Sequence, residues 1–286
     1  FPHTVAGAFL AAGGLVTAVA LWHLVRGRQP DDAPVYRSAL RLGAWTTLVA
    51  AVAVVLTGDR QGKIMVDVQP MKMAAAEALY HTQAPASFSI LTIGTLDGSR
   101  PIFQITVPHL LSYLSTGSLD GQVQGIDDLQ AQYVQLYGPG SYTPVIPVTY
   151  WTFRAMIGFG ILAALVALWA LWAQRRGRTP SNRWLLWAGL LLPFLPLAAN
   201  ATGWIFTEMG RQPWIVFGEM FTRNGVSRSV SSGEVIASLT VFTLLYGALA
   251  VVEAALMLRA ARRGLGPPRR PVAPHGGEDR PLEFAY

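Results

Sequence analysis

The sequence predicts an all-α integral membrane protein, a bundle of five transmembrane helices with a long extracytoplasmic loop. Three observations support this fold class. Only 13% of the residues are charged and 52% are hydrophobic, whereas roughly a quarter of a soluble domain is charged. Five apolar runs reach the roughly 20 residues that a helix needs to cross a hydrocarbon core. Most of the arginines lie in loops that alternating spans would place on one side of the membrane.

The longest connection between the five predicted spans follows the second. Arg154 interrupts the third span and Glu253 the fifth. Pro193 and Pro196 predict kinks in the fourth span. The spans are Thr4–Val25, Leu42–Gly58, Tyr150–Ala173, Trp184–Phe206 and Val235–Leu258.

The arginines predict the orientation. Of the 22 basic residues, 14 are arginines that lie between spans one and two, between spans three and four, or after span five. The positive-inside rule makes that side cytoplasmic, so we expect Phe1 outside and Tyr286 inside. The pI of about 9.9 is therefore a topology signal, and no nucleic acid is expected as a partner.

The chain divides into four predicted parts. Residues 1–58 hold the first two spans and a cytoplasmic loop, 59–147 form the extracytoplasmic loop, and 148–259 hold the last three spans. Residues 260–286 are rich in proline and glycine, which predicts a disordered cytoplasmic tail. The first residues lack the basic segment and cleavage site of a signal peptide, and we expect the chain to be the later part of a longer polypeptide.

The loop of 89 residues is too long for a simple connection, so a functional role is expected. Pro70 predicts a helix that begins at about this residue. The segment "PIFQITVPHLLSYL" is apolar but too short to span, which favours an interfacial or lipid-facing position. Lys72 and Glu77 lie five residues apart, about 140° around a helix, so their spacing alone gives them no shared site.

The residues that can bind a metal are few. The chain has no cysteine, which excludes disulfides, Cys-ligated zinc, iron–sulfur clusters and thiol catalysis. His3, Met156 and Glu208 all fall at the outer ends of their spans, at one predicted membrane depth. Imidazole with methionine is an axial pair for six-coordinate haem. Arg154 and Arg211, at the same level, have the guanidinium geometry that pairs with haem propionates.

Each of these residues also has a structural interpretation. His3 can be an interfacial residue, Met156 a core or lipid-facing side chain, and Glu208 one half of a salt bridge with Arg211 or a helix cap. Glu253 is an intramembrane carboxylate, which is costly to bury and points to function, although a position at the cytoplasmic edge also explains it. We interpret the three other histidines as structural: His23, His81 and His109.

Four motifs, in order along the chain, resemble subunit I of the cytochrome bd quinol oxidases, and the short loop resembles the short-loop subclass of that family. "HTVAGAF" begins at His3. "GDRQGKIMVDVQPMKMAAAEALYHTQ" resembles the start of the family's quinol-binding loop, the Q-loop. "FRAMIGFG" contains Met156, and "GRQPW" follows a tryptophan and Glu208. The resemblance covers Phe1–Leu258.

The resemblance implies roles for individual residues. His3 and Met156 become the axial ligands of a low-spin haem b, and Glu208 the ligand of a high-spin haem b. The other implied roles are Trp204 as an aromatic close to the haems, Arg154 and Arg211 as residues around the haems, and Lys72 and Glu77 as the pair for quinol oxidation.

The implied function is oxidation of a membrane quinol at the outer face, with electrons passing through haem b to a di-haem site that reduces O2 to water. Haem d belongs to that site, and its histidine ligand is expected outside this sequence, on further N-terminal helices. The implied partners are subunit II, small single-helix subunits and the lipid bilayer of the bacterial cytoplasmic membrane. Two alternatives stay open: a secondary transporter with an ion site at the broken fourth helix, and a haem-b membrane anchor that relays electrons without reducing oxygen.

Overall fold

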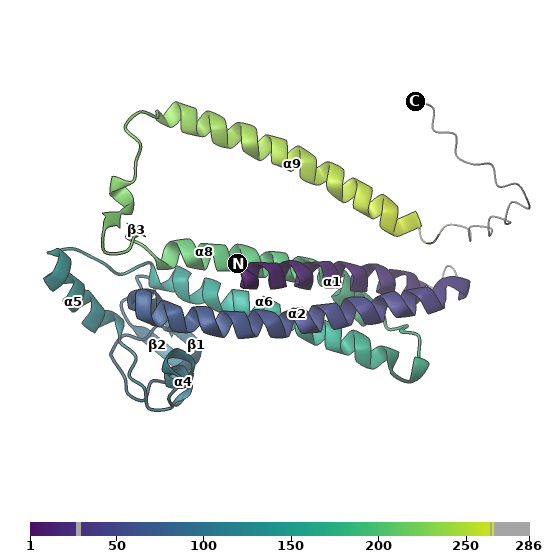
Figure 1. The fold of residues 1–286 in the computed structure, drawn as a ribbon, viewed down its shortest axis with the longest axis horizontal. Coiled ribbons are helices and arrows are strands. Elements are labelled where there is room, and N and C mark those ends of the chain that lie inside the picture. The colour runs from purple at the N-terminus through teal and green to yellow at the C-terminus, as the bar shows by residue number, and fades with distance from the viewer. Residues whose placement is uncertain (27–29, 264, 266–286) are drawn as a thin grey trace, which may run out of the picture. The chain divides into compact units, whose positions relative to one another are not determined.

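The computed structural model describes residues 1–26, 30–263 and 265 (Figure 1). The chain forms two compact units, Phe1–Ser231 and Ser232–Tyr286, and each is described by itself. The second unit is the helix α9, Ser232–Arg263. This helix continues four residues into the tail predicted as disordered, and the rest of that tail, apart from residue 265, lies outside the described residues.

Five helical segments are long and apolar enough to cross a membrane, which confirms the five predicted spans. The fourth is divided by a break at Leu192 and Pro193, as Pro193 predicted. Pro196 lies in the first turn of α8, where its missing N–H removes no helical hydrogen bond. The segments are α1 (Pro2–Arg26), α2 (Ala33–Val68), α6 (Ile146–Gln174), the pair α7 (Arg183–Leu191) and α8 (Phe194–Gly210), and α9.

Glycines bring α1 and α2 together. A Cβ on Gly13 would lie 2.8 Å from the Gly43 carbonyl oxygen, and one on Gly43 would lie 2.8 Å from the Thr17 backbone nitrogen. The Thr17 and Thr47 hydroxyls donate to the carbonyls of Gly13 and Gly43. Each helix therefore presents a small-xxx-small motif, the pattern that allows membrane helices to approach closely.

The segment between α2 and α6 has more regular structure than the sequence predicted. Helix α2 continues ten residues beyond Gly58, and the helix predicted at Pro70 is confirmed as α3. The apolar segment "PIFQITVPHLLSYL" forms a strand and the start of a helix, and its interfacial position stays a prediction. The elements are α3 (Pro70–Glu77), the antiparallel strands β1 (Phe88–Gly94) and β2 (Pro101–Val107), α4 (Leu110–Thr116) and α5 (Ile126–Tyr137).

A second hairpin and three short 3-10 turns complete the described elements. Strands β3 (Trp214–Val216) and β4 (Met220–Phe221) pair directly after α8. The turns are η1 (Pro30–Asp32), η2 (Arg175–Gly177) and η3 (Thr222–Asn224). The all-α class thus holds for the bundle, whereas the two hairpins lie outside the transmembrane helices.

An aromatic cluster connects the loop to the bundle. Trp214 is buried and stacks on Phe221, with ring centroids 4.2 Å apart. Tyr142, Tyr150 and Met71 belong to the same buried cluster. Since Met71 is in α3 and Tyr150 in α6, this packing holds α3 against the ends of α6 and α8, where the candidate site lies.

Candidate functional site

A buried ion pair lies where α3 meets α6. The Arg154 Nη2 donates to Glu77 Oε2 at 2.7 Å and to the Ser89 carbonyl at 2.6 Å. The Ser89 backbone N–H donates to the same Glu77 oxygen at 3.2 Å. The side chains of Glu77 and Arg154 are only 2% and 12% exposed. Burial raises the pKa of Glu77, and the charge of Arg154 opposes this rise.

Hydroxyl groups surround this ion pair. The Ser89 hydroxyl lies 2.8 Å from the Tyr150 hydroxyl and 2.7 Å from the Thr92 hydroxyl. The Thr92 backbone N–H donates to Tyr150 at 2.6 Å. These residues come from β1 and α6, so the hairpin and the transmembrane helix form one polar network. Ser89, Thr92 and Tyr150 were not predicted as site residues, because hydroxyl residues are common and only the fold brings these three together.

Lys72 lies on the same short helix as Glu77 but contacts a different neighbour. Its Nζ donates to the Thr207 carbonyl of α8 at 3.2 Å and lies 4.9 Å from the centroid of the Phe206 ring. Gly210 leaves room for the lysine stem, because a Cβ there would lie 3.0 Å from Lys72 Cγ. Burial lowers the pKa of Lys72, and the charge of Glu208 opposes this decrease. The two residues thus face α8 and α6 separately, as their spacing predicted.

A second glutamate–arginine pair ends α8. Arg211 Nη2 donates to Glu208 Oε2 at 2.5 Å, and the side chains are 36% and 33% exposed. The Gln212 side chain donates to the Glu208 carbonyl at 3.1 Å. This pair is the salt bridge that the structural interpretation of Glu208 described. Trp204, one turn earlier in α8, is 67% exposed.

Three guanidinium nitrogens in these pairs lack a partner. Nε and Nη1 of Arg154 and Nε of Arg211 are buried and donate no hydrogen bond to any described residue. Buried polar groups are nearly always hydrogen-bonded. Both arginines therefore have donor capacity for an additional acceptor, beyond the carboxylate that each already contacts.

His3 is held by a threonine of α2. Its Nδ1 lies 3.0 Å from the Thr57 hydroxyl oxygen, and that hydroxyl also lies 2.7 Å from the Ala53 carbonyl oxygen. A carbonyl only accepts, so Thr57 donates its single proton to Ala53 and accepts one from His3. The proton of a neutral His3 is then on Nδ1, and the lone pair of Nε2 is available for a metal. Thr57 was not identified from the sequence, since nothing in its own helix indicates the partner.

Met156 lies against a glycine of α8. A Cβ on Gly203 would lie only 2.7 Å from the Met156 sulfur, so the missing side chain gives that sulfur its space. Within the described ranges, no three His, Asp or Glu side chains gather as a site for a bare metal ion. Any metal at this end would therefore have few protein ligands, as iron held in a porphyrin does.

The remaining histidines have local contacts. The His23 ring stacks on Tyr36 with centroids 4.3 Å apart. His81 Nδ1 lies 3.3 Å from the Asp127 carboxylate, and His109 Nδ1 lies 3.2 Å from the Leu119 carbonyl oxygen. These contacts agree with the structural interpretation. Glu253 lies in α9, and its role stays open.

The fold and these residues define a class of protein: a multi-helix membrane protein with histidine, methionine and glutamate donors and buried arginines near one end of its bundle. The chain belongs to the cytochrome bd terminal oxidase subunit I family, whose family model matches residues 1–265. This membership favours the haem interpretation over the transporter.

Curated relatives agree. The chain is 34% identical over 265 residues to cytochrome bd ubiquinol oxidase subunit 1 of Bacillus subtilis (strain 168), covering 92% of this chain and 56% of the relative. It is 29% identical over 322 residues to cytochrome bd-II ubiquinol oxidase subunit 1 of Escherichia coli (strain K12), covering 92% and 62%. The chain thus spans little more than half the length of these relatives.

A solved structure has the same fold. The bd oxidase of Geobacillus thermodenitrificans matches with a TM-score of 0.75 and 27% sequence identity, covering 92% of this chain and 57% of that one. The helical arrangement of this chain is therefore that of a bd oxidase chain.

Proposed function

We propose that this chain supplies the quinol-oxidation site and haem-binding helices of a quinol:O2 oxidoreductase in the bacterial cytoplasmic membrane. The observation that carries the proposal is the buried pair of Glu77 and Arg154, in which two guanidinium nitrogens of the arginine have no partner. The names of the family and of the relatives support the reaction. The arginines at the opposite end of the bundle support an orientation with the loop outside.

The residues present fit haem groups. The three unpartnered guanidinium nitrogens of Arg154 and Arg211 suit haem propionates, because carboxylates are the preferred partners of guanidinium. The contact with Thr57 leaves Nε2 of His3 available, and Gly203 leaves room at the Met156 sulfur. His3 and Met156 would hold a low-spin haem b and Glu208 a high-spin haem b, with Trp204 nearby. Bound haems would supply electron transfer from quinol to O2, with haem d at the oxygen site.

Glu77 has the properties of a proton acceptor. Oxidation of a quinol to a quinone releases two protons and two electrons. A carboxylate with a raised pKa takes up a proton more readily than an exposed one, and burial raises the pKa of Glu77. Solvent barely reaches Glu77, and its carboxylate accepts hydrogen bonds from Arg154 and from the Ser89 backbone N–H.

Arg154 and Lys72 are positively charged residues near the proposed site of quinol oxidation. Arg154 pairs with Glu77 after the proton has left and so stabilises the carboxylate. Lys72 lies on the other face of α3, against α8, where its positive charge attracts the quinol oxygen as it becomes anionic. The proposed assembly includes subunit II and small single-helix subunits. The electron-relay alternative differs only in lacking oxygen reduction.

Optical spectra of the assembled protein test the haem sites. Met156→Leu should convert the low-spin haem b to a high-spin form, because leucine cannot ligate iron. Met209→Leu, a neighbouring methionine on α8, serves as the control. An unchanged low-spin spectrum in Met156→Leu would exclude this ligand assignment, and the absence of haem bands in the unmutated protein would exclude the function itself.

Glu208→Ala should remove the high-spin haem b while the low-spin haem stays. Haem content, measured against protein, checks this result. Retention of both haems would assign Glu208 to the salt bridge alone. Oxygen consumption driven by added quinol then distinguishes an oxidase from an electron relay.

A further inference from the structure

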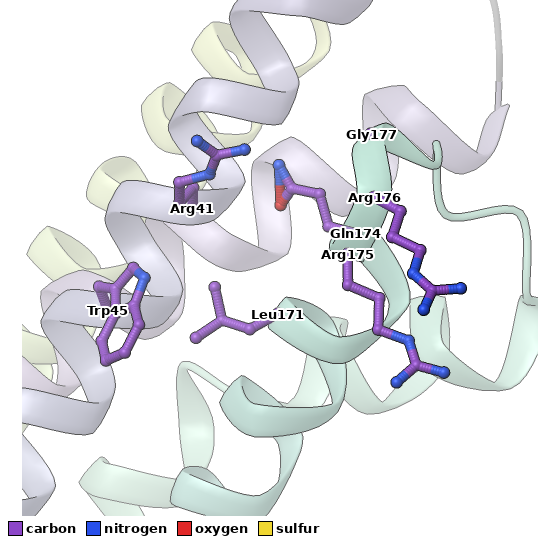
Figure 2. Close-up of a pocket in the computed structure, with 7 residues that line it drawn as sticks. All are labelled: Arg41, Trp45, Leu171, Gln174, Arg175, Arg176 and Gly177. Atoms are coloured by element: carbon purple, nitrogen blue, oxygen red, sulfur yellow. The ribbon is translucent and has the colours of Figure 1, made fainter.

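A cavity of about 240 Å³ lies between α2 and α6 at the end of the bundle opposite the loop. Arg41 and Trp45 of α2 line one side, and Leu171, Gln174 and the turn Arg175–Gly177 line the other (Figure 2). Pockets for drug-sized ligands range from about 300 to 1,000 Å³. The cavity is smaller, which suits the polar headgroup of a lipid whose acyl chains lie outside the cavity.

Gln174 points to a missing hydrogen-bond donor in this cavity. The residue is 4% exposed, and its Nε2 donates to the Arg37 carbonyl. Its Oε1 is buried and has no hydrogen-bond partner. Figure 2 shows the Gln174 amide between the two helices, on the side that faces Arg41. Because a buried acceptor without a donor is unfavourable, an occupant that donates a hydrogen bond here is stabilised.

The charge around the cavity selects an anion. Arg41, Arg175 and Arg176 contribute three guanidinium groups, and none of the three has an ion pair in the part of the chain that the structure describes. The described lining includes no acidic residue. Figure 2 shows the side chains of Arg175 and Arg176 directed away from Arg41, and the Arg175 guanidinium lies 4.6 Å from the Trp172 ring centroid.

The surroundings of the cavity are those of a membrane interface. Trp45 and Trp172 are both more than half exposed, and tryptophan concentrates at the headgroup level of a bilayer. Val49 and Leu168, about one turn further into the two helices, are exposed apolar residues that provide a surface for acyl chains. Basic pockets between transmembrane helices bind anionic lipid headgroups.

We propose that this cavity binds the headgroup of an anionic phospholipid that carries a free hydroxyl, as phosphatidylglycerol does. The phosphate lies against Arg41, and a glycerol hydroxyl donates to Gln174 Oε1. The proposal is independent of the oxidase function, because it rests on residues at the opposite end of the bundle.

Native mass spectrometry of the assembled protein, exchanged into defined lipids, tests the site. Phosphatidylglycerol should be retained and phosphatidylcholine should not. Arg41→Gln should weaken retention about tenfold or more, the scale of a lost charge-assisted hydrogen bond. Arg178→Gln, which removes a charge at the same end but outside the cavity lining, should retain the lipid like the unmutated protein. Equal losses in both variants would reduce the effect to general charge attraction and overturn the site.

Phosphatidylmethanol separates the role of Gln174 from that of the arginines. It carries the same phosphate diester charge but no hydroxyl, so the unmutated protein should bind it about three- to tenfold more weakly than phosphatidylglycerol, as expected for one hydrogen bond. In Gln174→Met this difference should disappear. Equal binding of the two lipids by the unmutated protein would overturn the headgroup assignment. Protection from thermal unfolding by inorganic phosphate equal to that by the lipid would indicate a phosphate site instead.

Discussion

The molecule contains two glutamate–arginine pairs of the same chemistry in different surroundings. Glu77 and Arg154 are almost fully buried and share their hydrogen bonds with Ser89, whereas Glu208 and Arg211 are each about one-third exposed. A buried pair is costly to break because the remaining charge has no solvent, whereas an exposed pair contributes little. The first pair therefore holds the loop on the bundle, and the second can exchange its partner for a ligand at little cost.

The largest expected effect is the loss of Arg154. Arg154→Gln leaves the Glu77 carboxylate buried without a counter-charge and should lower the free energy of unfolding by about 3–5 kcal/mol. Unfolding of the assembled protein in detergent measures this change. Arg154→Lys retains the charge but not the fork of N–H donors. Its free energy of unfolding should lie between those of the unmutated protein and Arg154→Gln. A free energy of unfolding for Arg154→Gln that lies within about 0.5 kcal/mol of the unmutated protein, as is usual for surface substitutions, would contradict the prediction from burial.

The buried pair should also have a pH signature. Because burial raises the pKa of Glu77 above its ordinary value of 4.5, the folded state binds a proton more readily than the unfolded state. The contribution of Glu77 to stability is therefore largest below pH 4.5 and decreases as the pH rises to the raised pKa. Glu77→Gln should abolish this pH dependence of the free energy of unfolding. The stability difference between the variant and the unmutated protein should therefore change with pH. The same variant should remove the corresponding limb of the pH profile of quinol oxidation, and an unchanged profile would argue against Glu77 as the proton acceptor.

A smaller effect is expected where an uncharged contact positions a ligand. Thr57→Val removes the acceptor for the His3 Nδ1–H and should weaken haem retention about tenfold. This is the lower end of the range for loss of a hydrogen bond to a metal-ligating histidine. Thr57→Ser retains the hydroxyl and should restore retention. The reduction potential of the low-spin haem should shift in Thr57→Val, and a shift of the same size in Thr57→Ser, which retains the hydroxyl, would show that the hydrogen bond is not responsible.

The smallest effect on stability is expected for the exposed pair. Arg211→Gln should change the free energy of unfolding by less than about 1 kcal/mol, although Arg211 contacts the proposed ligand Glu208. Arg223→Gln, an exposed arginine with no carboxylate partner among the described residues, is the control. A loss comparable with that of Arg154→Gln would show that the two pairs are equivalent and that partial exposure does not distinguish them.

Several features followed from local chemistry and were predicted correctly. The five spans follow from uncharged runs, because a helix in a bilayer satisfies its backbone internally. The break in the fourth span follows from Pro193, and the start of α3 follows from Pro70. The separate orientations of Lys72 and Glu77 follow from the helical angle between them.

Other features depend on contacts between distant segments. The extension of α2 past Gly58 carries polar residues that composition assigned to the loop, and the ion pair of Lys63 with Asp59 lies within it. The strands β1 and β2 were not predicted because their apolar residues alternate only in part. Arg154 was predicted as a residue around the haems, but its contact with Glu77 spans 77 positions.

By itself, the sequence determined the class of the molecule, its spans and the residue types able to hold iron, because hydrophobicity, proline and motif order act locally. Only the tertiary structure decided which residues meet. In the tertiary structure His3 contacts a threonine, Met156 lies against a glycine, and Arg154 pairs with a buried carboxylate. The side-chain oxygen of Gln174 is buried without a partner. The physical reason is that burial and hydrogen-bond satisfaction depend on packing between helices that are far apart in the chain.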